Sequence, residues 1–167
     1  MASRPATTPP TPRITPEQNG VRFGLLTAAV LCAYTLLAVL LGFFSRIEAG
    51  ALNALILVGG SVLAMRNLKL IYRDEMPYLG GYGTGIITTL VASVILAVFF
   101  ATITSLMPQA IDLTQIQNVF HADLSVIIGS LAIVLMGTMT GVITSLIGMQ
   151  YFKADRTDPL KSLDIER

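Results

Sequence analysis

Four long apolar windows contain no lysine or arginine and set the first constraint on this chain: residues 23–44, 47–65, 85–107 and 124–149. A helix of about 22 residues is about 33 Å long, enough to cross a hydrocarbon core of about 30 Å. Charged residues make up 13% of the chain, about half of the share found in a soluble domain. We therefore predict an all-α, polytopic membrane protein with four transmembrane helices packed as an antiparallel bundle.

The second window is less regular than the others. It contains Glu48 and Asn53, and we extend it to residue 71 because the long side chains of Arg66 and Lys69 reach the headgroups. It also contains Gly59-Gly60-Ser61, a candidate helix break that would line a cavity with backbone carbonyls. The four predicted spans are thus residues 23–44, 47–71, 85–107 and 124–149.

The positions of the cationic residues predict the orientation of the chain. Three lie before the first span, three between the apolar parts of the second and third spans, and four after the fourth, so ten of the 11 share one side. Arg46 is the exception. Because positive charge accumulates on the cytoplasmic side of a membrane, we predict that both termini are cytoplasmic.

Two tails flank the predicted membrane domain, residues 21–151. Residues 1–20 are rich in proline and threonine, and we expect a disordered cytoplasmic tail. Within them, Thr15-Pro16-Glu17-Gln18 has the pattern of a capping box, so a helix could begin there and run into the first span. Residues 152–167 alternate in the sign of their charge, as a solvated cytoplasmic tail does.

The segment between the third and fourth spans carries the sole histidine of the chain. Leu113, Ile116 and Phe120 share one face of a predicted amphipathic helix on the outer membrane surface. His121 lies near Asp123, but scattered ligands without a second histidine or a cysteine are weak evidence for a metal site. We therefore predict no metal and no cofactor.

Small residues recur at intervals of four in the third and fourth spans. Helices in lipid approach closely where small side chains let their backbones meet, so we predict that these two spans pack against each other. A dimer or a partner helix on the same residues is the alternative. The predicted packing residues are Gly85, Thr89, Ser93, Ala97 and Ala101 in the third span, and Gly129, Gly137, Gly141 and Ser145 in the fourth.

The spans hold few side chains that could carry a reaction. Ion pumps and proton-coupled carriers need ionisable groups at membrane depth, and none occurs away from the interfaces. The histidine and the single cysteine, Cys32, do not form a catalytic set. We predict that the protein is not an enzyme, and the absence of a basic face with interleaved aromatic residues argues against nucleic acid as a partner.

The segment after the second span is the densest polar segment near the membrane. Arg66, Lys69 and Arg73 recur at intervals of three and four, and with Tyr72 they form a candidate surface for contact with lipid or a partner. Ordinary positive-inside loop chemistry is the alternative. Residues 77–84 then read PYLGGYGT, and we expect a flexible turn there before the third span.

Tyr72-Arg73-Asp74-Glu75, followed by Gly81 and Gly85, resembles the pattern of a family of small bacterial inner-membrane proteins that is catalogued only as a domain of unknown function. The resemblance covers about residues 20–151. It implies a four-span protein of the bacterial inner membrane, and it brings no catalytic residues.

Three functions remain open at this point. We favour a non-enzymatic accessory or assembly subunit that acts by helix packing, among membrane lipids, as a homo-oligomer or within a larger membrane complex. The second is a small transporter or pore component that uses a break at Gly59-Gly60-Ser61. The third is a sensor of lipid or of a partner through residues 66–75 on the cytoplasmic side.

Overall fold

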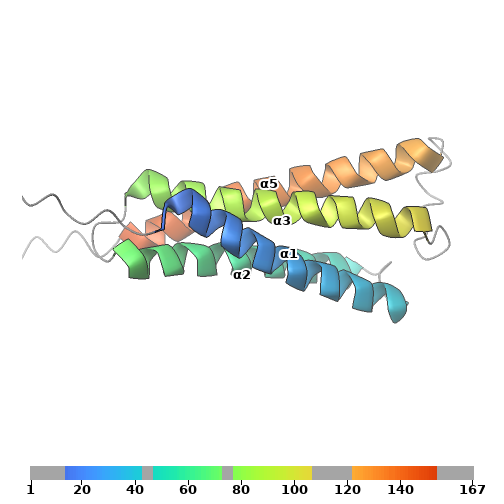
Figure 1. Cartoon of the computed structure of the whole chain (residues 1–167), viewed down its shortest axis with the longest axis horizontal. Coiled ribbons are helices and arrows are strands. Elements are labelled where there is room, and N and C mark those ends of the chain that lie inside the picture. Colours follow the sequence, from blue (N-terminus) through green and yellow to red (C-terminus); the bar gives the residue numbers. More distant parts are fainter. Residues whose placement is uncertain (1–13, 43–46, 73–76, 107–121, 154–167) are drawn as a thin grey trace, which may run out of the picture.

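The computed structural model describes residues 14–42, 47–72, 77–106 and 122–153. The elements in these ranges are α-helices that lie lengthwise beside one another in a four-helix bundle (Figure 1). Each is long and apolar enough to cross a membrane. The predicted all-α, polytopic membrane fold is therefore confirmed. The helices are α1 (Pro16–Leu40), α2 (Ile47–Tyr72), α3 (Tyr78–Leu106) and α5 (Ala122–Lys153).

The start of α1 is fixed by the capping box that the sequence indicates. The Thr15 hydroxyl accepts from the Gln18 backbone N–H at 3.3 Å, and the Gln18 side-chain oxygen accepts from the Thr15 N–H at 3.5 Å. Pro16 occupies the first helical position, where its missing N–H costs nothing. Residues 16–20 are thus helical and belong to the bundle, not to the predicted tail, whose residues 1–13 lie outside the described part of the chain.

The predicted turn before the third span is wrong, because α3 already begins at Tyr78. The Gly81 N–H donates to the Pro77 carbonyl at 3.1 Å and so closes the first turn of this helix. A Cβ added to Gly80 would come within 3.3 Å of the Pro16 ring on α1. The glycine at this position therefore lets two helix starts approach each other instead of bending the backbone.

The candidate break in the second span is absent, because α2 is helical throughout Gly59, Gly60 and Ser61. An added Cβ on Gly60 would collide with the Thr27 side chain of α1, so Gly60 lies where α1 and α2 pack closely together. The Ser61 hydroxyl is buried and donates to the Val58 carbonyl at 3.1 Å. Gly60 and Ser61 therefore serve packing, and the transporter hypothesis loses the feature on which it rests.

The contact between α3 and α5 is a ladder of glycines that face hydroxyl side chains. Gly85 lies against Ser145, Thr89 against Gly141, and Ser93 against Gly137. The pairs run in opposite order along the two helices, with each step four residues long on both sides. Ala97 is buried and Ala101 is half-buried, and Gly129 lies against the Phe100 ring. Seven of the nine predicted packing residues, all except Ala97 and Ala101, thus take part in contacts between α3 and another helix of the same chain.

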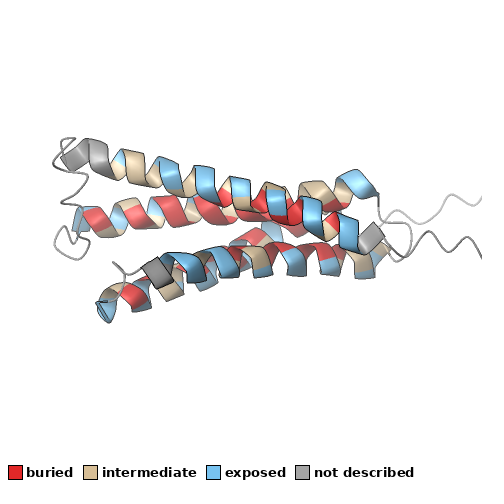
Figure 2. Cartoon of the chain, turned by 180° about the vertical axis from the view of Figure 1, so that it is seen from behind, coloured by how far each residue is buried: buried red, intermediate tan, exposed pale blue. Residues whose placement is uncertain are grey.

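The contact between α1 and α3 combines close approach with hydrogen bonds between the helices. The Thr84 hydroxyl lies 3.0 Å from the Pro16 carbonyl, and the Thr88 hydroxyl lies 3.2 Å from the Gly20 carbonyl. An added Cβ on Gly24 would meet the Val91 side chain at 2.8 Å. The apolar window of α3 is 39% buried, more than that of any other described helix, so α3 forms the centre of the bundle, and Figure 2 shows many buried positions there.

Replacing Gly141 by alanine is expected to destabilise the bundle by about 1–3 kcal/mol, because the new methyl group would collide with Thr89 on α3. Gly59→Ala is the matched control, since an added Cβ there meets nothing within 4 Å. We expect the control to be as stable as the wild type or more stable, because alanine favours a helix. Unfolding in detergent by titration with dodecyl sulfate compares the two variants, and equal stability would contradict the described α3–α5 contact.

Candidate functional site

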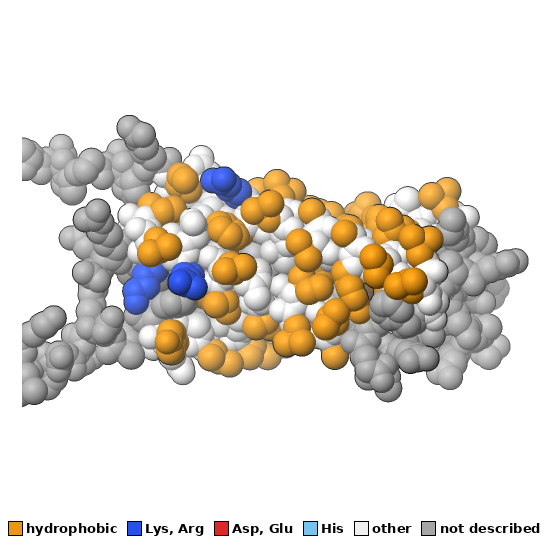
Figure 3. Space-filling model, turned by 90° about the horizontal axis from the view of Figure 1, so that it is seen from below, with side chains coloured by type: hydrophobic (Ala, Val, Ile, Leu, Met, Phe, Trp, Pro, Cys, Tyr) orange, Lys and Arg blue, Asp and Glu red, His pale blue; other side chains and the backbone are white. Residues whose placement is uncertain are grey.

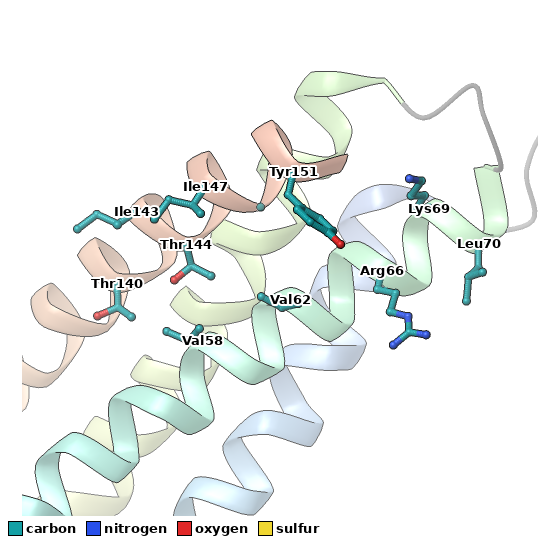
Figure 4. A pocket seen from close by; sticks show the side chains of 11 residues that line it. Val58, Val62, Arg66, Lys69, Leu70, Thr140, Ile143, Thr144, Ile147 and Tyr151 are labelled. Atoms are coloured by element: carbon teal, nitrogen blue, oxygen red, sulfur yellow. The ribbon is translucent and has the colours of Figure 1, made fainter. Parts of the chain in front are cut away.

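A groove of about 1180 Å³ lies between α2 and α5. Met65 of α2 is fully buried and lies against Gly148 of α5, one of the residues that line the groove. Figure 4 shows the lining side chains, which come from α2 on one side of the groove and from α5 on the other. The lining side chains are Val58, Val62, Arg66, Lys69 and Leu70 from α2, and Thr140, Ile143, Thr144, Ile147, Gly148 and Tyr151 from α5.

Most of the length of the groove is apolar. Valine, leucine and isoleucine side chains line both walls. The Thr140 hydroxyl donates to the Met136 carbonyl at 2.8 Å within its own helix, so its hydrogen-bonding demand is met without a ligand. No aspartate or glutamate occurs among the described residues that line the groove. This surface is therefore suited to hydrocarbon.

One end of the groove is cationic. Arg66 is exposed and Lys69 is half-buried, and both side chains leave α2 at this end. Figure 4 shows the Tyr151 ring extending from α5 toward α2 beside them. Blue lysine and arginine groups lie near one end of the molecule in Figure 3, and much of the remaining described surface on that face is hydrophobic. The groove therefore runs from an apolar body to a positively charged end.

Two hydrogen bonds hold the cationic end of α2 against α1 and the segment just before it. The Asn19 carboxamide is buried and donates to the Ala64 carbonyl at 2.9 Å, two residues before Arg66. The Tyr72 hydroxyl donates to the Ile14 carbonyl at 3.4 Å. These bonds fix the direction of the last turns of α2, and with it the place of Arg66 and Lys69 at the groove.

The predicted contact residues divide among three places. Arg66 and Lys69 line the groove, Tyr72 braces α2 against α1, and Arg73 lies outside the described residues. The predicted packing residues of α5 lie on the side that faces α3, and none of the predicted packing residues lines the groove.

Sequence reasoning missed Asn19, which it assigned to a tail, and it missed the whole α5 wall. The spacing of Thr140, Thr144 and Gly148 was an available signal, because it continues the period of four on a neighbouring face of α5.

Comparison with models of protein families, with curated proteins and with solved structures finds no match for this chain. The resemblance to a family of unknown function therefore stays a prediction. Among the residues that the structure describes, no three histidine, cysteine, aspartate or glutamate side chains are grouped as metal ligands. His121 and the amphipathic pattern before it lie outside those residues. The groove between α2 and α5 is therefore the feature of this chain that bears on function.

Replacing Asn19 by leucine is expected to destabilise the protein by roughly 0.6–1.7 kcal/mol, the range for hydrogen bonds between membrane helices. The substitution keeps the size of the side chain but removes the donor to the Ala64 carbonyl. Asn67→Leu makes the same chemical change at a half-buried position of α2 and serves as the control. Thermal unfolding in detergent measures both, and a smaller loss for Asn19→Leu than for the control would contradict the brace.

Proposed function

We propose that this chain is a non-enzymatic integral membrane protein that binds an anionic membrane lipid in the groove between α2 and α5. The observation that carries the proposal is the division of one groove into an apolar body and a cationic end. A phospholipid has the same division, with acyl chains joined to a charged headgroup. The match of both parts along one groove distinguishes this site from an ordinary lipid-facing surface.

The size of the groove supports a chain-like ligand. Its volume of about 1180 Å³ exceeds the roughly 300–1,000 Å³ of pockets that enclose a drug-sized molecule. Valine and isoleucine side chains would cover the acyl chains, and the cost of ordering those chains would be offset by burial of apolar surface at about 25 cal/mol per Å². The ligand would enter sideways from the bilayer, since the groove lies on the lipid-facing side of two helices.

The cationic end supports an anionic headgroup. Arg66 and Lys69 both line the groove, and long cationic side chains of this kind keep their charged ends in the headgroup region. Each contributes about 1 kcal/mol of attraction to an anionic lipid surface. Tyr151 stands at the same level, where aromatic side chains with a polar end favour the interface.

We further propose that this end faces the cytoplasm of a bacterial cell, with both termini on that side of the plasma membrane. Ten of the 11 lysines and arginines fall on the side that carries the termini, and cytoplasmic loops carry such an excess. The resemblance of Tyr72-Arg73-Asp74-Glu75 and its glycines to a bacterial inner-membrane family supports the same location.

A second candidate is an accessory or assembly subunit that receives a helix of a partner protein in the same groove. Thr140, Thr144 and Gly148 follow one another at intervals of four along the α5 wall, and such small residues let a second backbone approach. Only 11% of the apolar window of α5 is buried within the bundle, against 39% for α3. This candidate predicts a co-purifying protein at a fixed ratio, and the lipid proposal does not.

Replacing Arg66 and Lys69 together by glutamine is expected to weaken binding of phosphatidylglycerol by about 30-fold, since two charges of about 1 kcal/mol each are lost. Arg22→Gln is the matched control, because Arg22 is an exposed cation of α1 that does not line the groove. Native mass spectrometry of the protein with phosphatidylglycerol or phosphatidylcholine measures bound lipid.

Thr144→Trp separates the groove from simple charge attraction, because it fills the groove and leaves every cation in place. We expect this variant to lose bound phosphatidylglycerol as the double glutamine variant does. Equal binding of both lipids by the wild type, or equal loss in Arg22→Gln and the double variant, would contradict the proposal. A stoichiometric partner protein in place of lipid would favour the accessory subunit.

A further inference from the structure

A second, smaller cavity of about 230 Å³ lies among all four described helices. It shares no lining residue with the groove, and on α2 it lies at Asn53, before the first groove residue, Val58. Its lining residues are Thr35 from α1, Asn53 from α2, Leu96 and Phe100 from α3, and Gly129 and Ile133 from α5. Its interior is therefore mainly apolar, with two polar side chains.

Among the residues that the structure describes, one buried polar atom on each of these two side chains has no hydrogen-bond partner. Thr35 is 2% exposed, and its hydroxyl has no partner. The side-chain oxygen of Asn53 is buried and also has none. Other threonines of the bundle satisfy their hydroxyls within their own helix, as Thr27 does with the Phe23 carbonyl and Thr104 with the Phe100 carbonyl, both at 2.8 Å. Thr35 departs from that pattern. The hydroxyls of Ser93, Ser130 and Ser145 also have no partner among the described residues, but only Thr35 and Asn53 of this set line the cavity.

Leaving these polar atoms without hydrogen bonds raises the free energy of the folded protein. The surrounding bilayer offers no water to pair with them, and the penalty for a buried polar group without a partner is several kcal/mol in hydrocarbon. A ligand that supplies the missing hydrogen bonds would remove this penalty. The same two side chains would then determine which ligand is accepted.

We propose that this cavity binds a small uncharged molecule that carries a hydroxyl group on an apolar body, such as a phenol. The Asn53 oxygen can only accept, so the ligand must donate a hydrogen bond, and the Thr35 hydroxyl can donate one in return. A single O–H group meets both needs. Leu96 and Ile133 would contact the apolar body, and the Phe100 ring would pack against an aromatic one.

Size and charge narrow the class of ligand further. The volume is below the roughly 300–1,000 Å³ of sites for drug-sized ligands, so the molecule is small. It is uncharged, because none of the described lining residues is ionisable and an unpaired charge is far more costly to bury than a hydroxyl. This site does not depend on the lipid groove, since the two share no side chain.

The test uses the full chain in detergent micelles and follows binding by fluorine NMR with 4-fluorophenol. Fluorobenzene is the matched ligand control, because it has nearly the same shape and no hydroxyl. We expect saturable binding of 4-fluorophenol at least about tenfold tighter than any binding of fluorobenzene, since two hydrogen bonds are lost with the hydroxyl. This comparison needs no protein variant.

The double variant Thr35→Val with Asn53→Leu removes both polar groups at nearly constant size. We expect it to bind 4-fluorophenol about tenfold more weakly, whereas Thr102→Val, on an exposed face of α3, leaves binding unchanged. A cavity that holds only water would show no saturable binding of 4-fluorophenol, and that result overturns the proposal. Equal affinity for the two ligands, or unchanged affinity in the double variant, also overturns it.

Discussion

The close approach of α3 to its neighbours is the contact on which the rest of the bundle depends. Helices in lipid gain no hydrophobic free energy by associating, so their backbones must come close enough for van der Waals contact and for hydrogen bonds between helices. Glycine facing serine or threonine provides this along α3 and α5, as in the pair Gly141 and Thr89. α3 is the most buried of the described helices, and α2 and α5, which both pack on it, form the two walls of the groove.

The sequence predicted the parts of the fold that follow from a regular period. Charge-free windows predicted the helices, and the interval of four from Gly85 onward pointed to the face on which α3 meets α5. Single glycines were harder to interpret, because the same residue permits a turn or a close contact. Gly80 and Gly60 both lie in continuous helices. The residues that fill the space beside them, Pro16 and Thr27, come from α1, which is distant in the sequence.

The candidate site was only half predictable for a related reason. The cationic spacing of Arg66 and Lys69 is local, so it was visible in the sequence. The opposite wall of the groove is about 80 residues away, and the side of α5 that faces α2 is set by how α5 packs on α3. The polar side chains inside the bundle have different roles that the sequence does not distinguish: Asn19 braces α2, whereas Thr35 and Asn53 line a cavity.

The central claim is that the groove between α2 and α5 holds an anionic lipid. The most direct measurement is a cryo-electron microscopy structure of the protein in nanodiscs that contain phosphatidylglycerol, with an antibody fragment added for size. We expect two continuous acyl-chain densities along Val62 and Ile147, with the headgroup density near Arg66 and Lys69. A groove closed by direct contact of α2 with α5, or filled by a helix, would contradict it.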